Sequence, residues 1–361
     1  MNPFHEKIST WLARPVPERA INTCLDSSVI LSTDIGLHRK ENQDRVAAIK
    51  VDTKVSGEHK LIAIAVADGM GGQRDGAKCA TLALSSFFYA LATYRTLDIQ
   101  QRTLAAINHA NNSVFRFANG NGGTTLSAIV IDHKLQPLTV HLGDSRIYSF
   151  GDSDPVKRLT TDDSLAEVVG GHARELVQFI GMGEGMQPHL AAIPHETKNL
   201  LITTDGIHFI GSPLLEKILS NSNNIKMATE RLAALARWCG GPDNASSASI
   251  DINTLTKLFF TDKEGGIQLW DPFGSLTAIW VDANDLRIAN PIVCRPQNVN
   301  ERQAESTPKK KNRRASTKQK RKTSNKASPK TVANRAPKEE LQLEIQIEST
   351  PDPDHSNDHS K

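Results

Sequence analysis

The sequence predicts an α+β fold, an α/β sandwich in which mainly antiparallel sheets are covered by helices on the outside. Two observations support this prediction. Between about residues 28 and 283, strand-like segments follow one another in runs and helix-like segments come in pairs, an order that favours antiparallel sheets over a parallel βαβ sheet. In addition, 361 residues with 38% hydrophobic content suffice for one large domain and an appendage.

The first half of this region contains both periodicities. Short segments rich in β-branched residues predict strands, and apolar residues at helical spacing predict helices. A glycine cluster at 120–123 ends the second helix. The expected strands are 29–36, 45–51, 59–68, 124–132, 138–144 and 146–150, and the expected helices are 76–93 and 100–119.

The second half is less regular. Residues 164–181 resemble a helix interrupted by Gly170 and Gly171, and 199–205 is a short apolar strand. Helices are expected at 212–220 and 226–239, and a last strand at 275–282. Roughly 25 residues, 251–274, look inserted, and their sequence indicates no role.

The composition predicts an intracellular protein. No run of about 18 apolar residues exists, so we expect no membrane span, and the N-terminus lacks the apolar core of a secretory signal. The four cysteines, Cys24, Cys79, Cys239 and Cys294, are widely spaced, which favours plain thiols over zinc ligands. A cytoplasmic location follows as the expectation.

The C-terminal tail differs sharply from the rest. Residues 309–338 contain 13 Lys or Arg and no acidic residue, whereas 339–361 contain seven acidic residues and one Lys. With few large apolar side chains, residues 286–361 cannot offset their ordering entropy, so we expect disorder. The basic part is either a solvated linker or an electrostatic anchor for nucleic acid, an acidic protein or an anionic membrane surface.

Several aspartates occupy similar local settings. Asp68, Asp144 and Asp205 each follow an apolar, strand-like run and lie beside a glycine, while Asp44 and Asp243 lie in polar loops. A single Asp-Gly after a strand is typical of a turn, so each motif taken alone fits a turn as well as a ligand. Together they indicate one sheet edge that gathers hard oxygen ligands for divalent metals.

The order of these motifs resembles the metal-dependent protein phosphatases of type 2C, the PPM family, over roughly residues 28–283. The chain is most similar to its bacterial members. Seven elements match the family's order: Gly36 with Arg39, Asn42 and Asp44; Asp68-Gly-Met-Gly-Gly; Gly123-Thr-Thr; Gly143-Asp-Ser-Arg; Leu159-Thr with an acidic pair; Thr204-Asp-Gly; and Asp243-Asn.

The resemblance implies a four-layer α/β/β/α sandwich with two central, mainly antiparallel β-sheets, and two Mn²⁺ or Mg²⁺ ions at its end. By position, Asp68 would bridge both ions and the Gly69 carbonyl would complete one of them. Asp205 and Asp243 would hold the other ion, and Asp44 would act mostly through ordered waters. Such an oxygen-rich, water-keeping shell suits both metals.

Two further residues acquire roles from the resemblance. Arg39 would bind the phosphate with its planar guanidinium, a task that lysine performs less well. Asp144 matches a position that helps to bind a third, weaker metal in several members, and a second interpretation is a turn aspartate. Gly123, Thr124 and Thr125 are expected to serve tight strand packing.

The chain also departs from the family pattern. Gln43 stands where many members have glutamate, which predicts weaker metal binding. Met70 stands where animal enzymes carry a histidine, so water becomes the expected proton source for the leaving group. Asp163 occupies a place often filled by histidine, and the expected flap, 164–190, is short and rich in glycine, which predicts mobility and altered substrate selection.

The resemblance implies a phosphatase that hydrolyses phosphoserine and phosphothreonine by direct attack of a metal-bridging hydroxide. An inactive, phosphatase-like regulatory binding protein is the alternative, because of Gln43 and the unusual flap. The expected partners are phosphorylated proteins, including a Ser/Thr kinase or its substrates, and the expected state is a monomer. The predicted division is an N-terminal extension (1–27), a catalytic domain (28–285) and the tail (286–361).

Overall fold

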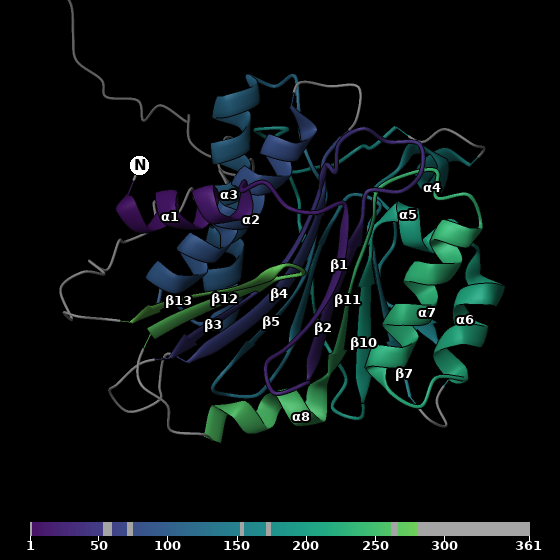
Figure 1. Cartoon of the computed structure of the whole chain (residues 1–361). Coiled ribbons are helices and arrows are strands. Elements are labelled where there is room, and N and C mark those ends of the chain that lie inside the picture. Colours follow the sequence, from purple (N-terminus) through teal and green to yellow (C-terminus); the bar gives the residue numbers. More distant parts are fainter. Residues whose placement is uncertain are drawn as a thin grey trace, which may run out of the picture. The chain divides into compact units, whose positions relative to one another are not determined.

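A computed structural model of the chain describes residues 2–52, 60–70, 75–151, 155–170, 175–260 and 266–279. Within this part, two sheets face each other at the centre and helices cover their outer faces (Figure 1). Every pairing between the described strands is antiparallel. The predicted four-layer sandwich with two central antiparallel sheets is therefore confirmed.

The first sheet has six strands and the second has seven. In spatial order the first contains β1 (Arg19–Cys24), β2 (Val29–Asp34), β11 (Ala245–Asp251), β10 (Asn199–Thr203), β7 (Arg146–Phe150) and β8 (Lys157–Arg158). The second contains β13 (Gly274–Ile279), β12 (Gly266–Asp271), β3 (Asp44–Asp52), β4 (Leu61–Asp68), β5 (Leu126–Asp132), β6 (Leu138–Leu142) and β9 (His189–Ala192).

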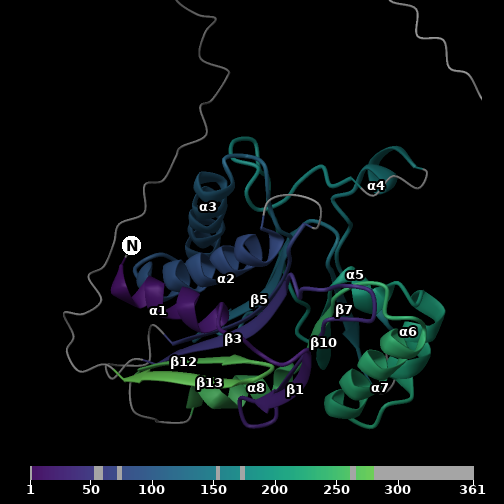
Figure 2. The ribbon, with the colours of Figure 1, turned by 45° about the horizontal axis from the view of Figure 1, so that its top comes forward.

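Helices form the two outer layers, as Figure 2 shows from a second direction. On the seven-stranded sheet lie α1 (Pro3–Leu12), α2 (Gly76–Thr93) and α3 (Ile99–Ala118). On the six-stranded sheet lie α5 (Asp205–His208), α6 (Ser212–Ser220) and α7 (Ile225–Trp238). The remaining elements are α4 (Leu165–Val169), α8 (Ile252–Lys257) and the 3₁₀-helix η1 (Leu258–Phe260).

Three apolar cores hold these layers together, one between the sheets and one under each helical layer. Side chains alternate between the two faces of each central strand, so one strand contributes to two of these cores. In β4, Ile62, Ile64 and Val66 face the core between the sheets, whereas Leu61 and Ala63 face α1–α3. Nearly every residue of β3 and β4 is therefore buried, and residues 46–49 and 61–67 are all apolar.

Local signals explain the helix boundaries. Asp98 caps α3 by accepting hydrogen bonds from the N–H groups of Gln100 and Gln101, and Asn119 ends this helix in the left-handed conformation, with φ 52°. Asn224 caps α7 through the Met227 N–H. These capping residues leave few of the terminal backbone groups unpaired.

Some predicted elements differ from the structure. The helix expected at 164–181 is limited to α4, because Gly170 ends it with φ 81° and the chain from Glu175 to Ile180 forms irregular bridges. The segment 1–27 contains α1 and β1, and the segment 251–274 contains α8 and β12, which pairs with β3.

Two outcomes concern the rest of the chain. Among the described residues, no helix is both long and apolar enough to cross a membrane. The structure does not describe the tail, so its expected disorder stays a prediction. Also outside the described residues are Gly71, Gly72, Gly171 and Cys294.

Candidate active site

Asp44 and Asp68 are direct partners across two neighbouring strands. Asp44 begins β3, Asp68 ends β4, and the antiparallel register pairs them. Both lie on the same strand faces as Val46 and Val66, which belong to the core between the sheets. The two carboxylates therefore lie at the end of the space between the sheets.

Three more aspartates reach this end from other strand termini. Asp205 follows β10 as the first residue of α5, and Asp243 lies two residues before β11. Asp144 lies in the turn between β6 and β7. We call these five residues the aspartate edge: Asp44, Asp68, Asp144, Asp205 and Asp243. The structure thus brings together all of the predicted carboxylates.

Hydroxyl and amide side chains fix the edge between the two sheets. The Thr204 hydroxyl, fully buried, donates to Asp44 Oδ2 (2.9 Å) and accepts from the Ser246 N–H (2.9 Å). Asn244 accepts from the Gln43 N–H (2.8 Å) and donates to two carbonyls of the preceding loop, Ile35 (2.8 Å) and Glu41 (3.0 Å). The loop carrying Arg39 is thereby tied to the start of β11.

Two glycines allow a very close backbone approach at Asp243 and Asn244. A Cβ on Gly36 would lie 2.3 Å from the Asp243 carbonyl oxygen, and a Cβ on Gly206 would lie 2.0 Å from that of Asn244. Any side chain at either position would collide with backbone. The Thr-Asp-Gly and Asp-Asn motifs are therefore in direct contact.

The Gly-Thr-Thr segment has a role that the sequence did not reveal. Thr124 Oγ1 donates to the Asp68 carbonyl (2.7 Å), and the Asp68 N–H donates to Thr125 Oγ1 (2.9 Å). Gly123 does serve packing, because a Cβ there would lie 2.3 Å from Phe179. The two threonines thus orient Asp68. The only signal in the sequence that could have indicated this role was the place of Gly-Thr-Thr among the ordered motifs.

Burial and mutual repulsion both act on the carboxylates of the edge. Burial, followed by neighbouring carboxylates including Asp205, raises the pKa of Asp144 to about 7. Burial raises the pKa of Asp44 to about 8, with Asp205 and Asp243 adding to the effect, and it raises that of Asp68 well above its usual value. A bound cation would relieve this repulsion.

The donor set fits hard divalent cations. It consists only of oxygen atoms, and Asp44 Oδ1 is buried with no hydrogen-bond partner. Within the described residues, no three His, Cys, Asp or Glu side chains are arranged as a ready-made metal site. A cation held partly through water, as Mg²⁺ usually is, matches both findings.

Arg39 lies beside the edge and is half exposed. Its Nη2 contacts Asp243 Oδ2 at 2.6 Å, and 43% of its side chain is accessible to solvent. The hydrogen bond that Arg39 donates to Asp243 raises the pKa of Arg39, with the charges of Asp205 and Asp68 contributing, so the guanidinium stays charged. Arg39, the residue predicted to bind the phosphate, thus lies beside the aspartate edge.

Three polar residues near the motifs have structural roles. The Gln43 side chain packs against Gly76 at the start of α2. His208 is buried and its Nδ1 lies 3.0 Å from Thr203 Oγ1, and burial holds its pKa well below the usual value. Arg146 forms an ion pair with Asp162 at 2.7 Å.

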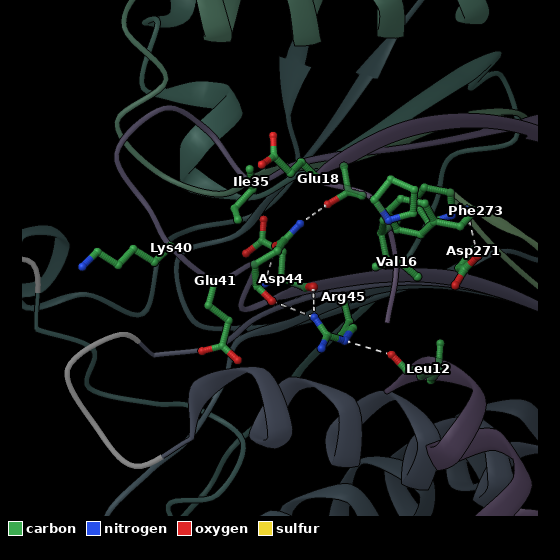
Figure 3. Close-up of a pocket in the computed structure, with 15 residues that line it drawn as sticks. Leu12, Val16, Glu18, Ile35, Lys40, Glu41, Asp44, Arg45, Asp271 and Phe273 are labelled. Carbon is green, nitrogen blue, oxygen red and sulfur yellow. Dashed lines mark hydrogen bonds between the residues drawn. The ribbon is translucent and has the colours of Figure 1, made fainter. Parts of the chain in front are cut away.

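A cavity of about 270 Å³ adjoins Asp44 (Figure 3). Val16, Pro17 and Phe273 contribute apolar walls, and Glu18 and Glu41 contribute charge. A bidentate ion pair between Arg14 and Asp271 joins the segment after α1 to the β12–β13 turn. The cavity thus lies between these two segments and the start of β3.

The protein phosphatase 2C family matches residues 38–240, which include four residues of the aspartate edge and Arg39. The chain belongs to the protein phosphatase 2C family. No curated protein matches the chain. The predicted enzyme class, a serine/threonine phosphatase of this family, is confirmed.

Solved bacterial phosphatases share the fold. The PPM Ser-Thr phosphatase MsPP from Mycobacterium smegmatis, solved with cacodylate, is 27% identical, with a TM-score of 0.51, covering 62% of this chain and 97% of that one. The S. agalactiae serine/threonine phosphatase is 24% identical, with a TM-score of 0.54 and 62% and 98% coverage. Mycobacterium tuberculosis PstP/Ppp is 23% identical, with a TM-score of 0.51 and 62% and 97% coverage. The S. agalactiae and M. tuberculosis enzymes are less than 25% identical to this chain, so these two comparisons show a shared fold only.

Proposed function

We propose that this phosphatase hydrolyses phosphoserine and phosphothreonine in phosphorylated proteins, using two Mn²⁺ or Mg²⁺ ions at the aspartate edge. The observation that carries the proposal is the convergence of five partly or fully buried, mutually repelling carboxylates beside a charged arginine. Such a constellation is costly to fold unless cations neutralise it.

We assign the ligands as the resemblance to the family implies. Asp68 would contact both ions and the Gly69 carbonyl would complete one of them, while Asp205 and Asp243 would hold the other. Asp44 would act through water, which agrees with its buried, unpartnered Oδ1. Asp144, whose pKa is raised by burial and then by the charge of Asp205, is assigned to a third and weaker site.

Two divalent ions in such a site supply a water of lowered pKa and neutralise charge on the phosphoryl oxygens. The chain's own residues orient the reactants. Thr124 and Thr125 hold the Asp68 backbone from both sides, and Thr204 holds Asp44. Because these carboxylates are held in place, they need little reorganisation when the transition state forms, which lowers its free energy.

Arg39 is proposed to bind the phosphate. Its guanidinium presents donors in a planar fork that matches phosphate oxygens, and its exposure leaves donors accessible at the edge. Water is the proposed proton source for the leaving group, since Met70 has no ionisable group and His208 is buried against Thr203.

The predicted partners fit this activity. Phosphorylated proteins, including those modified by a Ser/Thr kinase, are the proposed substrates. The cytoplasmic location, the monomeric state and the binding of nucleic acid or an acidic partner by the basic tail stay predictions from the sequence.

Hydrolysis of para-nitrophenyl phosphate tests the proposal. We expect turnover with Mn²⁺ or Mg²⁺, complete loss with excess chelator, and at least a 100-fold loss in Asp68→Ala and Asp205→Ala. Asp132→Ala is the matched control, because Asp132 is buried at the opposite end of β5 from the residues that hold Asp68. Full turnover in excess chelator would refute the metal mechanism, and phosphopeptide binding without turnover would favour the regulatory alternative.

A further inference from the structure

Asp163 is a buried carboxylate that the proposed chemistry does not use. Only 6% of the residue is exposed, yet its two oxygens accept three hydrogen bonds. Oδ2 accepts from the Gly143 N–H (3.0 Å), and Oδ1 accepts from Gln178 Nε2 (3.2 Å) and His189 Nε2 (2.9 Å). The donors come from two different parts of the chain.

The first part is the turn that carries Asp144. Besides the contact through Oδ2, the Asp163 N–H donates to the Gly143 carbonyl at 2.7 Å, so one residue holds both backbone groups of Gly143. Gly143 has φ 102°, and a Cβ there would lie 2.6 Å from Thr125, the residue that accepts from the Asp68 N–H. The position of Asp144 relative to Asp68 therefore depends on this clamp.

The second part is residues 175–190 of the expected flap, which the structure describes and which we call the flap from here on. The Asp163 carbonyl accepts from the Val177 N–H at 2.8 Å. Gln178, bound to Asp163 Oδ1, also accepts from the Gln187 N–H at 2.8 Å through its side chain. His189, the third donor, begins β9. Asp163 thus contacts the flap at three positions separated by up to 12 residues.

We propose that Asp163 is a positioning residue that couples the conformation of the flap to the position of Asp144. The proposal rests on the proposed function, in which Asp144 belongs to the metal site. Because an ionised carboxylate only accepts hydrogen bonds, it can satisfy donors from the turn and from the flap at the same time. Asparagine would place its NH₂ group toward one of these two sets of donors.

An ordinary buried turn aspartate provides the comparison. Asp132 is also 6% exposed and accepts from a backbone N–H, that of Lys134, at 2.9 Å. Its partner lies two residues away, whereas the side-chain partners of Asp163 lie 15, 20 and 26 residues away. A residue with only a local role would behave like Asp132.

Hydrogen exchange followed by mass spectrometry tests the coupling without needing activity. Gln178→Ala removes a contact with Asp163 from the flap side alone, and we expect it to speed exchange in peptides covering 140–146 about three-fold or more. Asp163→Asn should speed exchange both there and in 175–190, and Asp132→Asn in neither. If Gln178→Ala leaves 140–146 unchanged, the coupling is refuted, whether or not the enzyme turns over.

A double-mutant cycle with turnover then tests the positioning of Asp144. We expect Asp163→Asn and Asp144→Asn each to lower kcat for para-nitrophenyl phosphate about ten-fold, with little change in KM, and the double variant to be no more than about two-fold worse than either. Multiplied effects, or a loss no larger than that of Asp132→Asn, would refute the positioning role. Absence of metal-dependent turnover in the unmodified enzyme would instead refute the proposed function.

Discussion

Replacing Thr204 by valine should separate the support of Asp44 from the shape of the core. The two side chains have similar volumes, but valine lacks the hydroxyl that donates to Asp44 Oδ2 and accepts from the Ser246 N–H, each at 2.9 Å. All three residues are at least 97% buried, so water does not replace the lost bonds. Leaving a buried polar group unpaired costs about 1–3 kcal/mol, and two such groups cost about 2–6 kcal/mol in total.

Urea unfolding in the presence of chelator measures this loss. Thr204→Ser is the matched control, because serine keeps the hydroxyl and removes only a methyl group, at about 1 kcal/mol. We expect Thr204→Val to lower the free energy of unfolding by at least 1 kcal/mol more than Thr204→Ser. Equal stability of the two variants would refute the hydrogen-bond reasoning, since the hydroxyl would then contribute nothing.

Three further predictions concern other features. Gly206→Ala should destabilise the protein by about 3 kcal/mol and abolish turnover, because its Cβ would lie 2.0 Å from the Asn244 carbonyl oxygen. Gly185→Ala, which has open space around it but a φ of 89°, is the control for backbone strain without a clash, and equal thermal shifts in the two variants would contradict the clash. Mn²⁺ at 100-fold its Kd should stabilise the protein by about 2.7 kcal/mol for each ion bound, measured by thermal unfolding, and a Tm independent of Mn²⁺ would argue against the site. Burial, followed by the nearby His109, lowers the pKa of His5 to about 4, below its value in the unfolded chain. The unfolded chain therefore binds the proton more readily, and the free energy of unfolding should fall as the pH drops from about 6.5 to 4. His5→Gln should flatten this pH dependence in urea titrations, and an unchanged slope would assign it to other groups.

The sequence predicted most of the fold because the central strands are unusually apolar. β3 and β4 face a core on each side, so residues 46–49 and 61–67 are continuous apolar runs, and their β-branched content and short length distinguished them from helices. β11 lies in an equally central position but reads Ala-Ser-Ser-Ala-Ser-Ile-Asp. Its small polar residues bond to Thr33 and Thr229, which no propensity scale indicates.

The candidate site was predicted from motif order, and its supporting contacts were not. The order along the chain placed five aspartates and Arg39 at one edge, where the structure has them. The hydroxyl bonds of Thr124 and Thr125 to Asp68 join residues more than 50 positions apart, so local reasoning assigned these threonines to packing. The pairing of Arg39 with Asp243 likewise depends on contacts between distant loops.

The register of β3 against β4 has a consequence for how this enzyme could fail. Side chains alternate between the faces of a strand, so a slip of one residue would turn either Asp44 or Asp68 away from its partner and bury it among α1–α3. The same slip would also send Val46 or Val66 to the wrong core, which is far more costly than losing one ligand. Burial of the apolar residues inside the sheet therefore also fixes the alignment of Asp44 with Asp68 at its end. A molecule with the shifted register would be inactive, but it would also be too unstable to accumulate.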